Sequence, residues 1–165
     1  MKCLTIMEPF AWLIVDAVRL GIPHPKDIEN RKDRFGTFAG QLLIHSAKDS
    51  ARRYTQNPLE EWLDTVGEKA PPGFWPYDLD SIRNRGIIGV VYVANTVFVD
   101  EINPKSQWHN SLWAEGPRCL LINEVYPFDK HIPFRGQQGL FDVPDHLVAD
   151  AIELAMERRA IQESQ

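Results

Sequence analysis

Residues 86–99, GIIGVVYVANTVFV, are the strongest strand signal in the chain. The run is long and rich in β-branched residues, which favour strands, and it predicts a buried β-strand. Gly89 interrupts it, and a glycine inside a strand is typical of a bend or a bulge. Two apolar runs, AGQLLIHSA at 39–47 and RCLLINEVYPF at 118–128, predict further strands that could pair with it.

Two shorter extended segments and two helices complete the pattern. KDIENR at 26–31 is a mostly polar strand candidate, and IPFRGQQGLFDVP at 132–144 predicts two short extended pieces. EPFAWLIVDAVRLG at 8–21 predicts a helix, with a proline in its first turn and a glycine at its end. Residues 145–160 predict a second helix, capped by Asp145. The expected apolar faces are Phe10, Leu13, Ile14, Ala17 and Val18 in the first helix and Leu147, Val148, Ala151, Leu154 and Ala155 in the second.

Several strands with few helices predict an α+β fold built around a curved or closed sheet. The chain has 165 residues, of which 44% are hydrophobic, and this suits a single domain with one sizeable core. We expect an insert at about 49–85, helical over 49–66 and irregular over the proline-rich loop that follows.

The charge and composition of the chain limit the kinds of molecule that it can bind. A net charge of -5 argues against a protein that holds nucleic acid by bulk attraction alone. Residues 26–53 nevertheless carry a charge of +3, and a basic patch of this size suits a small or short anionic ligand. Cys3 and Cys119 are too few for a disulfide framework, so we expect reduced core residues. The N-terminal region lacks the long apolar run of a signal peptide or membrane helix, which predicts a cytoplasmic protein with no membrane partner.

Generic catalytic motifs are absent from the sequence, including GxSxG, HExxH and glycine-rich phosphate loops. The five histidines show no metal-ligand spacing, so we predict neither a metal site nor a cofactor. His45 follows a buried strand, where a histidine more often makes structural hydrogen bonds than contacts a ligand.

If the charged stretch at 26–31 is an extended strand, its side chains alternate between two faces. Glu29 and Arg31 would then share one face with Asp27, while Ile28 would enter the core. A sheltered Glu–Arg pair can bind a planar ligand, because the carboxylate accepts from N–H groups and the guanidinium donates to oxygens. The alternative is an exposed ion pair with no measurable effect. Lys26 can reach the same face as Glu29 only if it still belongs to the preceding turn.

Five segments, TIMEPFAWLI, PKDIENR, GQLLIHSA, GIIGVVYV and HIPFRGQQGLFDVP, occur in this order across residues 2–144. In order and spacing they resemble the ASCH domain (activating signal cointegrator 1 homology), a relative of the PUA fold. The most specific piece is the GxKxxExR pattern of that family, which appears here as Pro25, Lys26, Glu29 and Arg31.

The resemblance implies a small PUA-like β-barrel with flanking helices, a single domain over residues 1–165, and a cleft lined by the KxxExR residues. It also implies binding of RNA or of a nucleotide-like ligand. One bacterial branch hydrolyses a modified cytidine with a lysine, a threonine and a glutamate; Lys26 matches that lysine, whereas Glu29 stands at the position of the threonine. Glu8 would add a carboxylate at the rim of the cleft or cap the first helix, and we favour the cap.

Three functions remain open from the sequence. The first is a module that binds RNA or a nucleoside-like ligand; the second is a hydrolase acting on a modified nucleoside or on RNA, with Lys26 and Glu29 as catalytic residues. The third is an adaptor that meets a protein partner through the 49–85 insert. The candidate ligand-binding residues are Lys26, Glu29, Arg31, Arg34, His45, Lys48, Arg52 and Arg53, with Phe10, Trp12 or Trp75 stacking on a base.

Overall fold

The computed structural model describes residues 1–50, 64 and 80–165. They form a mixed six-stranded sheet with the strand order β2-β5-β4-β3-β1-β6. Strands β1 and β3 pair in parallel, and the other neighbouring strands pair antiparallel. The elements are β1 (Lys2–Glu8), α1 (Phe10–Arg19), β2 (Ile28–Arg31), the 3-10 turn η1 (Asp33–Phe35), β3 (Gly40–Ser50), β4 (Gly86–Phe98), the 3-10 turn η3 (Val99–Glu101), β5 (Arg118–Ile132), β6 (Leu140–Asp142) and α3 (Asp145–Glu163).

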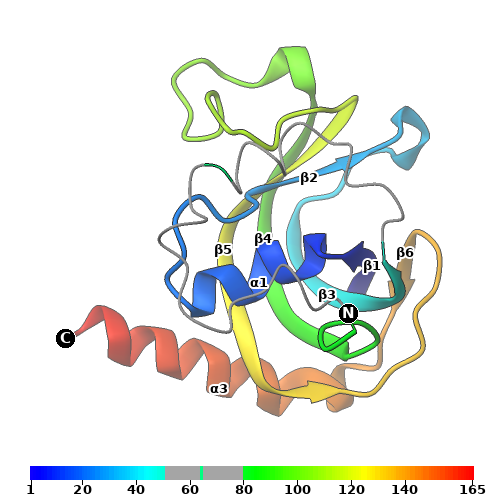
Figure 1. The fold of residues 1–165 in the computed structure, drawn as a ribbon, viewed down its shortest axis with the longest axis vertical. Coiled ribbons are helices and arrows are strands. Elements are labelled where there is room, and N and C mark those ends of the chain that lie inside the picture. The colour runs from blue at the N-terminus through cyan, green and yellow to red at the C-terminus, as the bar shows by residue number, and fades with distance from the viewer. Residues whose placement is uncertain (51–63, 65–79) are drawn as a thin grey trace.

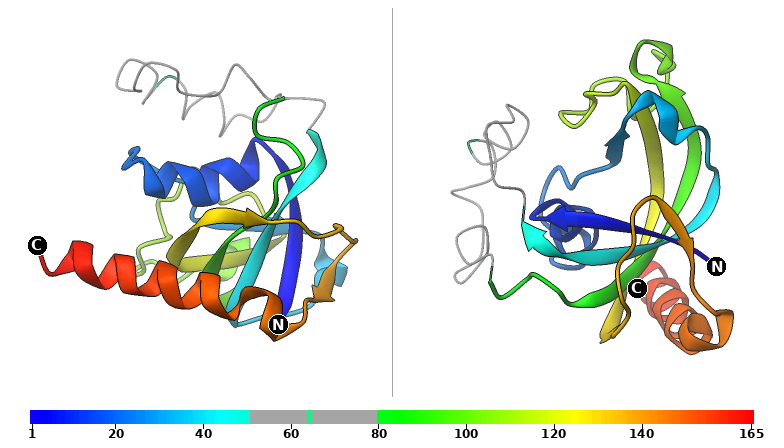
Figure 2. Two further views of the ribbon diagram at one scale, coloured as in Figure 1. Left: turned by 90° about the horizontal axis from the view of Figure 1, so that it is seen from below. Right: turned by 90° about the vertical axis from the view of Figure 1, so that its right-hand side faces the viewer.

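The sheet is strongly curved, with α1 inside the curve and α3 along the outside (Figures 1 and 2). The predicted α+β class is therefore confirmed. The predicted closed barrel is not seen in the described part of the chain, where the strand order leaves β2 and β6 as the two edges. Neither of the helices described here is long and apolar enough to cross a bilayer.

The predicted strand at 86–99 is β4, which lies inside the sheet between β5 and β3, and Gly89 does mark a bulge. The pairing with β5 shifts register between Ile87 and Gly89. A Cβ atom on Gly89 would lie 2.9 Å from the carbonyl oxygen of Tyr126, which explains why a glycine stands there. The shift also changes the phase of the strand, so that Ile88 faces the core around α1 while Ile87 and Val90 face the core under α3.

Strand β1 was not predicted, because its sequence lacks the usual alternation of apolar and polar residues. Cys3 and Leu4 are adjacent in the chain and both fully buried, one in the core under α3 and the other in the core around α1. A strand covered on both faces loses the two-residue period. Cys3 and Cys119 are buried free thiols, as expected.

Helix α1 is more deeply buried than one apolar stripe suggests. Residues 11–17 are all buried, including Asp16, because the curved sheet covers the helix on most sides. Val18, expected on the buried face, is 37% exposed. Gly21 has a φ of 65° just beyond the helix, where it allows the chain to turn away.

Helix α3 extends to Glu163, and its predicted apolar face is partly wrong. Val148 and Ala155 are buried against the sheet, but Leu147 and Leu154 are exposed, because the helix touches the sheet along a narrow strip. Asp145 does not cap the helix. Its carboxylate accepts a hydrogen bond from the N-terminal amine, 2.9 Å away, and Pro144 holds the capping position.

The predicted insert at 49–85 is only partly described. Residues 49–50 belong to β3 and are not helical. The rest of the predicted helical segment lies outside the described residues except for Asp64, which is helical, and the predicted irregular loop at 67–78 lies outside them entirely. Residues 80–85 lead into β4 and place Arg85 next to the first strand residue.

Replacing Gly86 by alanine should destabilise the chain more than replacing Gly36. Both glycines have positive φ, at 79° and 81°, so both variants carry a backbone strain of about 1–2 kcal/mol. A Cβ at Gly86 would in addition overlap the carbonyl group of Ile132, whereas Gly36 has open space around it. Denaturant unfolding of the two variants should differ by roughly 1–3 kcal/mol. Equal losses would show that β4 and β5 do not approach this closely.

Candidate functional site

Strand β2 separates a core side chain from two charged ones. It pairs with β5 from Ile28 to Arg31, and Ile28 is fully buried in the core beside α1. Lys26 precedes the strand, and its backbone N–H donates to the carbonyl of Leu13 in α1 at 2.9 Å. The turn before β2 is thus fixed to the helix. This position outside the strand allows Lys26 to approach Glu29 although the two are three residues apart.

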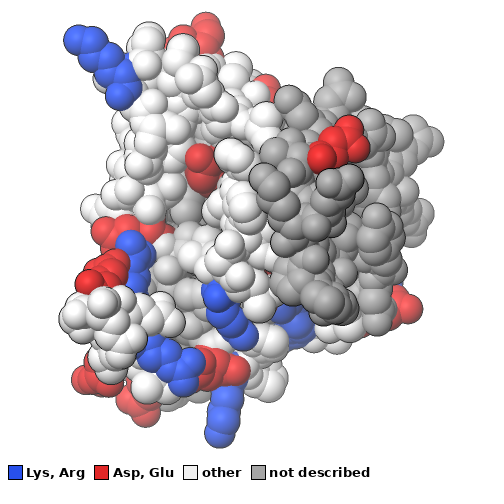
Figure 3. Space-filling model, turned by 60° about the vertical axis from the view of Figure 1, so that its left-hand side comes forward, with Lys and Arg blue, Asp and Glu red and all other residues white. Residues whose placement is uncertain are grey.

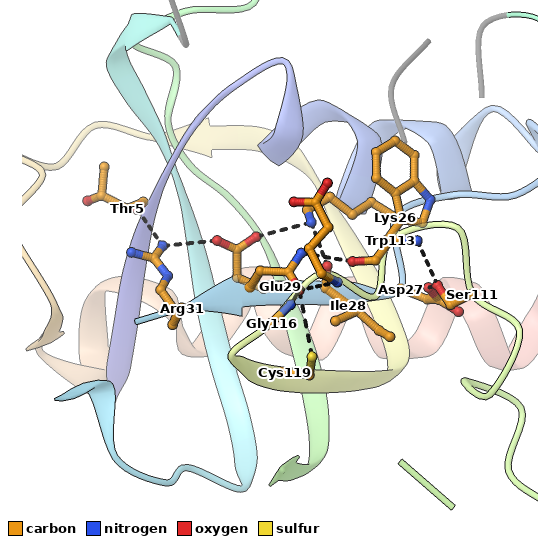
Figure 4. Close-up of polar contacts among 12 residues, drawn as sticks. Thr5, Lys26, Asp27, Ile28, Glu29, Arg31, Ser111, Trp113, Gly116 and Cys119 are labelled. Atoms are coloured by element: carbon orange, nitrogen blue, oxygen red, sulfur yellow. Dashed lines mark hydrogen bonds and ion pairs between the residues drawn. The ribbon is translucent and has the colours of Figure 1, made fainter. Parts of the chain in front are cut away.

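A continuous series of polar contacts joins Lys26, Glu29 and Arg31 (Figure 4). The Lys26 ammonium donates to the carbonyl of Ile28 at 2.5 Å and lies 3.6 Å from Glu29 Oε2. Glu29 Oε1 lies 3.2 Å from Arg31 Nη2, which also donates to the carbonyl of Thr5 in β1 at 3.2 Å. The sequence prediction that these three charged residues meet is therefore matched by the geometry.

The Lys26–Glu29–Arg31 cluster is sheltered from solvent. Lys26 is 5% exposed and Glu29 9%, while the Arg31 side chain is 25% exposed and forms the outer end. The Lys26 ammonium faces the rings of Phe10 and Trp113, at 5.6 Å and 5.4 Å from their centroids. In so dry a site the polar groups interact strongly with one another, and with any ligand that displaces the remaining water.

Asp27 does not join this cluster. The Ser111 hydroxyl donates to its carboxylate at 2.5 Å, so Asp27 ties the start of β2 to the loop before β5. Burial raises the pKa of this carboxyl, and the Ser111 hydrogen bond partly offsets the effect. The expectation that Asp27 shares a site with Glu29 and Arg31 fails because the strand begins only at Ile28.

Asn30 holds the same loop in place. Its amide group donates to the carbonyl of Trp113 at 2.8 Å, and its oxygen accepts from the backbone of Glu115 and Gly116 at 3.0 Å and 2.8 Å. Trp113, one of the two rings beside Lys26, therefore owes its position to β2 itself. No sequence pattern indicated this contact between residues more than 80 positions apart.

The other predicted ligand residues are dispersed. His45 is buried, with Nε2 2.7 Å from the carbonyl of Phe134 and Nδ1 3.4 Å from the Thr5 hydroxyl, which supports its structural interpretation. Lys48 is exposed near the end of β3, and Arg34 is exposed in η1. Trp12 is buried in the core. Arg52, Arg53 and Trp75 lie outside the described residues.

A groove of about 930 Å³ opens beside Arg31. We call it the η1 groove: it runs between the end of β2 with η1 on one side and residues 137–140 on the other, and Thr5 also lines it. In Figure 1 these segments lie on the right-hand side of the sheet. Arg31 is the member of the Lys26–Glu29–Arg31 cluster that lines this groove, so its side chain connects the two.

A buried ion-pair cluster of Glu8, Asp16 and Arg85 was missed by the sequence analysis, which considered Glu8 alone. Glu8 is fully buried; its Oε1 accepts from the backbone N–H of Trp12 at 2.8 Å and its Oε2 from Arg85 at 3.0 Å. The other terminal nitrogen of Arg85 donates to Asp16 at 2.9 Å. Glu8 thus satisfies the start of α1, as expected, and does not reach the rim of the cleft. A buried carboxylate at the start of a helix needs a cation beside it, and this rule could have indicated that Glu8 has a basic partner.

Burial raises the pKa of Glu8 to about 7, although Arg85 opposes this change. His131 is also close to this group: burial, followed by the charge of Arg85, lowers its pKa, and its Nε2 is buried without a hydrogen-bond partner among the described residues. No group of His, Cys, Asp or Glu suited to a metal ion occurs in the described parts of the chain.

Elsewhere on the surface, opposite charges are interspersed. The face in Figure 3 shows Lys and Arg side chains mostly beside Asp and Glu side chains. Ion pairs between exposed side chains include Arg159 with Glu163 and Lys2 with Asp142. Such a surface offers little attraction to a long polyanion.

Glu8→Gln should change how stability depends on pH. The usual pKa of a glutamate, 4.5, describes the unfolded chain, and the folded value is about 7. Between these values the folded state retains a proton that the unfolded state has lost. The contribution of Glu8 is therefore complete below pH 4.5 and is lost as the pH rises through 7. The free energy of unfolding of the wild type relative to Glu8→Gln should fall by on the order of 2–3 kcal/mol over this range.

Urea unfolding at several pH values measures this difference. His131 affects stability in the opposite direction, but it is present in both proteins and cancels in the comparison. A difference that stays constant from pH 4.5 to pH 7 would contradict the burial of an ionisable Glu8.

Comparison with known proteins gives a likeness in structure alone. No protein-family model and no curated protein matches this chain. Among solved structures, the chain is similar to the crystal structure of a point mutant of ZmASCH from Zymomonas mobilis, with 15% sequence identity and a TM-score of 0.49, covering 93% of this chain and 96% of that one.

Proposed function

We propose that this chain is an ASCH-domain protein with a PUA-like fold that binds RNA, or a nucleotide- or nucleoside-like ligand, through Lys26, Glu29 and Arg31. One observation carries the proposal: these three charged residues are joined by contacts of 3.2–3.6 Å in a sheltered site whose outer end, Arg31, lines the η1 groove. The five motifs found in family order support the same function.

The chemistry of the cluster suits a nucleobase. A carboxylate has about four lone-pair sites and can accept from a ring or amino N–H while it keeps its ion pairs. Arg31 Nη1 makes no hydrogen bond or ion pair with any described residue, so it can donate to a carbonyl or phosphate oxygen. Phe10 is half-buried at the edge of the site and offers a ring face for stacking.

A hydrolase is the second candidate. Lys26 and Glu29 lie together in a dry site, an arrangement that can support acid–base or nucleophilic chemistry. We rank it second because the Lys26 ammonium is already engaged by a carbonyl, a carboxylate and two ring faces, whereas a lysine that acts as a base or nucleophile must be free to meet its substrate.

Arg31→Gln should weaken binding of short RNAs or nucleosides by about 10- to 100-fold, because it removes the donor at the outer end of the cluster. Arg31→Lys should fall between this variant and the wild type, since it keeps the charge but loses the planar fork. Isothermal titration measures both. Arg83→Gln is the matched control, since it removes the same charge from an exposed ion pair with Asp80 and does not line the η1 groove.

Thermal unfolding of each variant confirms that it is folded before affinity is compared. Unchanged affinity in folded Arg31→Gln would overturn the proposed site. Incubation of the wild type with acylated nucleosides and with RNA should leave both intact. Turnover that disappears in Lys26→Ala would instead establish the hydrolase.

A further inference from the structure

The η1 groove has an unusual charge for this chain. Its described lining includes Arg31, Lys32 and Arg34 and contains no Asp or Glu residue. The chain as a whole carries a net charge of -5. A groove whose charged lining residues are all cations, on an acidic protein, concentrates positive potential at one place.

Neighbouring acids leave two of the three cations in the groove, Lys32 and Arg34, without an ion pair among the described residues. Asp33 lies between Lys32 and Arg34 in sequence, but its carboxylate lies 3.3 Å from Arg118. Glu29 is shared between Lys26 and Arg31. Lys32 and Arg34 make no ion pair with any residue that the structure describes. Their charges are therefore available to a ligand.

The groove also offers hydrogen-bond donors that the folded chain does not use. Arg31 Nε is buried without a hydrogen-bond partner among the described residues, an arrangement that is uncommon in folded proteins. Opposite Arg31, Gln137 and Gln138 line the second wall with amide groups. The Phe35 ring, 5.9 Å from the Arg31 guanidinium, adds an apolar surface on the first wall.

We propose that the η1 groove binds a phosphate group of the ligand, so that the preferred ligand is phosphorylated rather than a bare nucleoside. This inference rests on the proposed function, because Arg31 connects the base-binding cluster with the groove. Lys32 and Arg34 have no competing acid among the described residues, and Arg31 keeps one terminal nitrogen free beside its ion pair with Glu29. Together they suit a phosphate, which carries several strong acceptor oxygens. A volume of about 930 Å³ has room for a nucleotide.

Titration of the full chain with matched ligands tests the inference. The ligands are the four common ribonucleosides, their 5′- and 3′-monophosphates, and dinucleotides that lack a terminal phosphate. We expect at least one phosphorylated ligand to bind about tenfold or more tightly than its nucleoside. That advantage should shrink as salt rises, because it is electrostatic. Tighter binding of monophosphates alone would indicate that the groove takes a terminal phosphate. Tighter binding of dinucleotides would indicate that it takes a phosphate within an RNA chain. Both results support the inference.

Lys32→Gln combined with Arg34→Gln should abolish the advantage of the phosphorylated ligand over its nucleoside when both are titrated against the same variant. Lys105→Gln combined with Lys130→Gln is the control, since it removes two exposed charges outside the groove. Nucleosides that bind through Arg31 with no gain from phosphate would overturn this inference and leave the proposed function intact. If neither nucleosides nor phosphorylated ligands bind, the proposed function fails as well.

Discussion

The burial of α1 within a curved sheet is the constraint on which the rest of this structure depends. A helix covered on most sides must satisfy its polar groups inside the protein, where water is not available. Glu8 does so at the start of the helix, and Arg85 then balances both Glu8 and Asp16. Because Arg85 also donates to the carbonyl of Ile82, one guanidinium connects the helix with the segment that enters β4.

The candidate site follows from the same arrangement. The carbonyl of Leu13, still inside α1, accepts from the backbone of Lys26, so the position of the helix determines where the lysine enters the cleft. Phe10, the first residue of α1, provides one of the two rings beside the ammonium. A site assembled from a buried helix and a sheet strand is held more rigidly than one built on surface loops, which favours binding with little reorganisation.

Sequence patterns predicted the elements whose buried residues form a recognisable apolar pattern within a few positions. Strand β4 has a continuous apolar run and a glycine at its bulge, and Ile28 among charged neighbours correctly located β2. Strand β1 escaped detection because both of its faces are covered. The curvature that leaves the sheet open, and the exposure of Leu147, depend on how whole elements pack, which no short window contains.

For the candidate site, too, local patterns could be predicted from the sequence and contacts between distant segments could not. The two-residue period of a strand placed Glu29 and Arg31 on one face, and a turn before β2 allowed Lys26 to reach that face. Contacts between distant segments were out of reach: Asp27 with Ser111, Asn30 with the loop at 113–116, and Arg85 with Glu8. In each case the partner is separated by more than 70 residues and occurs in a segment with no pattern of its own.

Strand β2 has only four residues, and each has a different task. Ile28 fills the core, Glu29 and Arg31 form the charged cluster, and Asn30 holds the loop that carries Trp113. No position of the strand is free to vary without disturbing either the interior or the site. Under the proposed function, changes in ligand preference would therefore have to arise outside the strand, in η1 and in the 137–140 segment across the groove. The short strand acts as the fixed reference against which these outer parts can diverge.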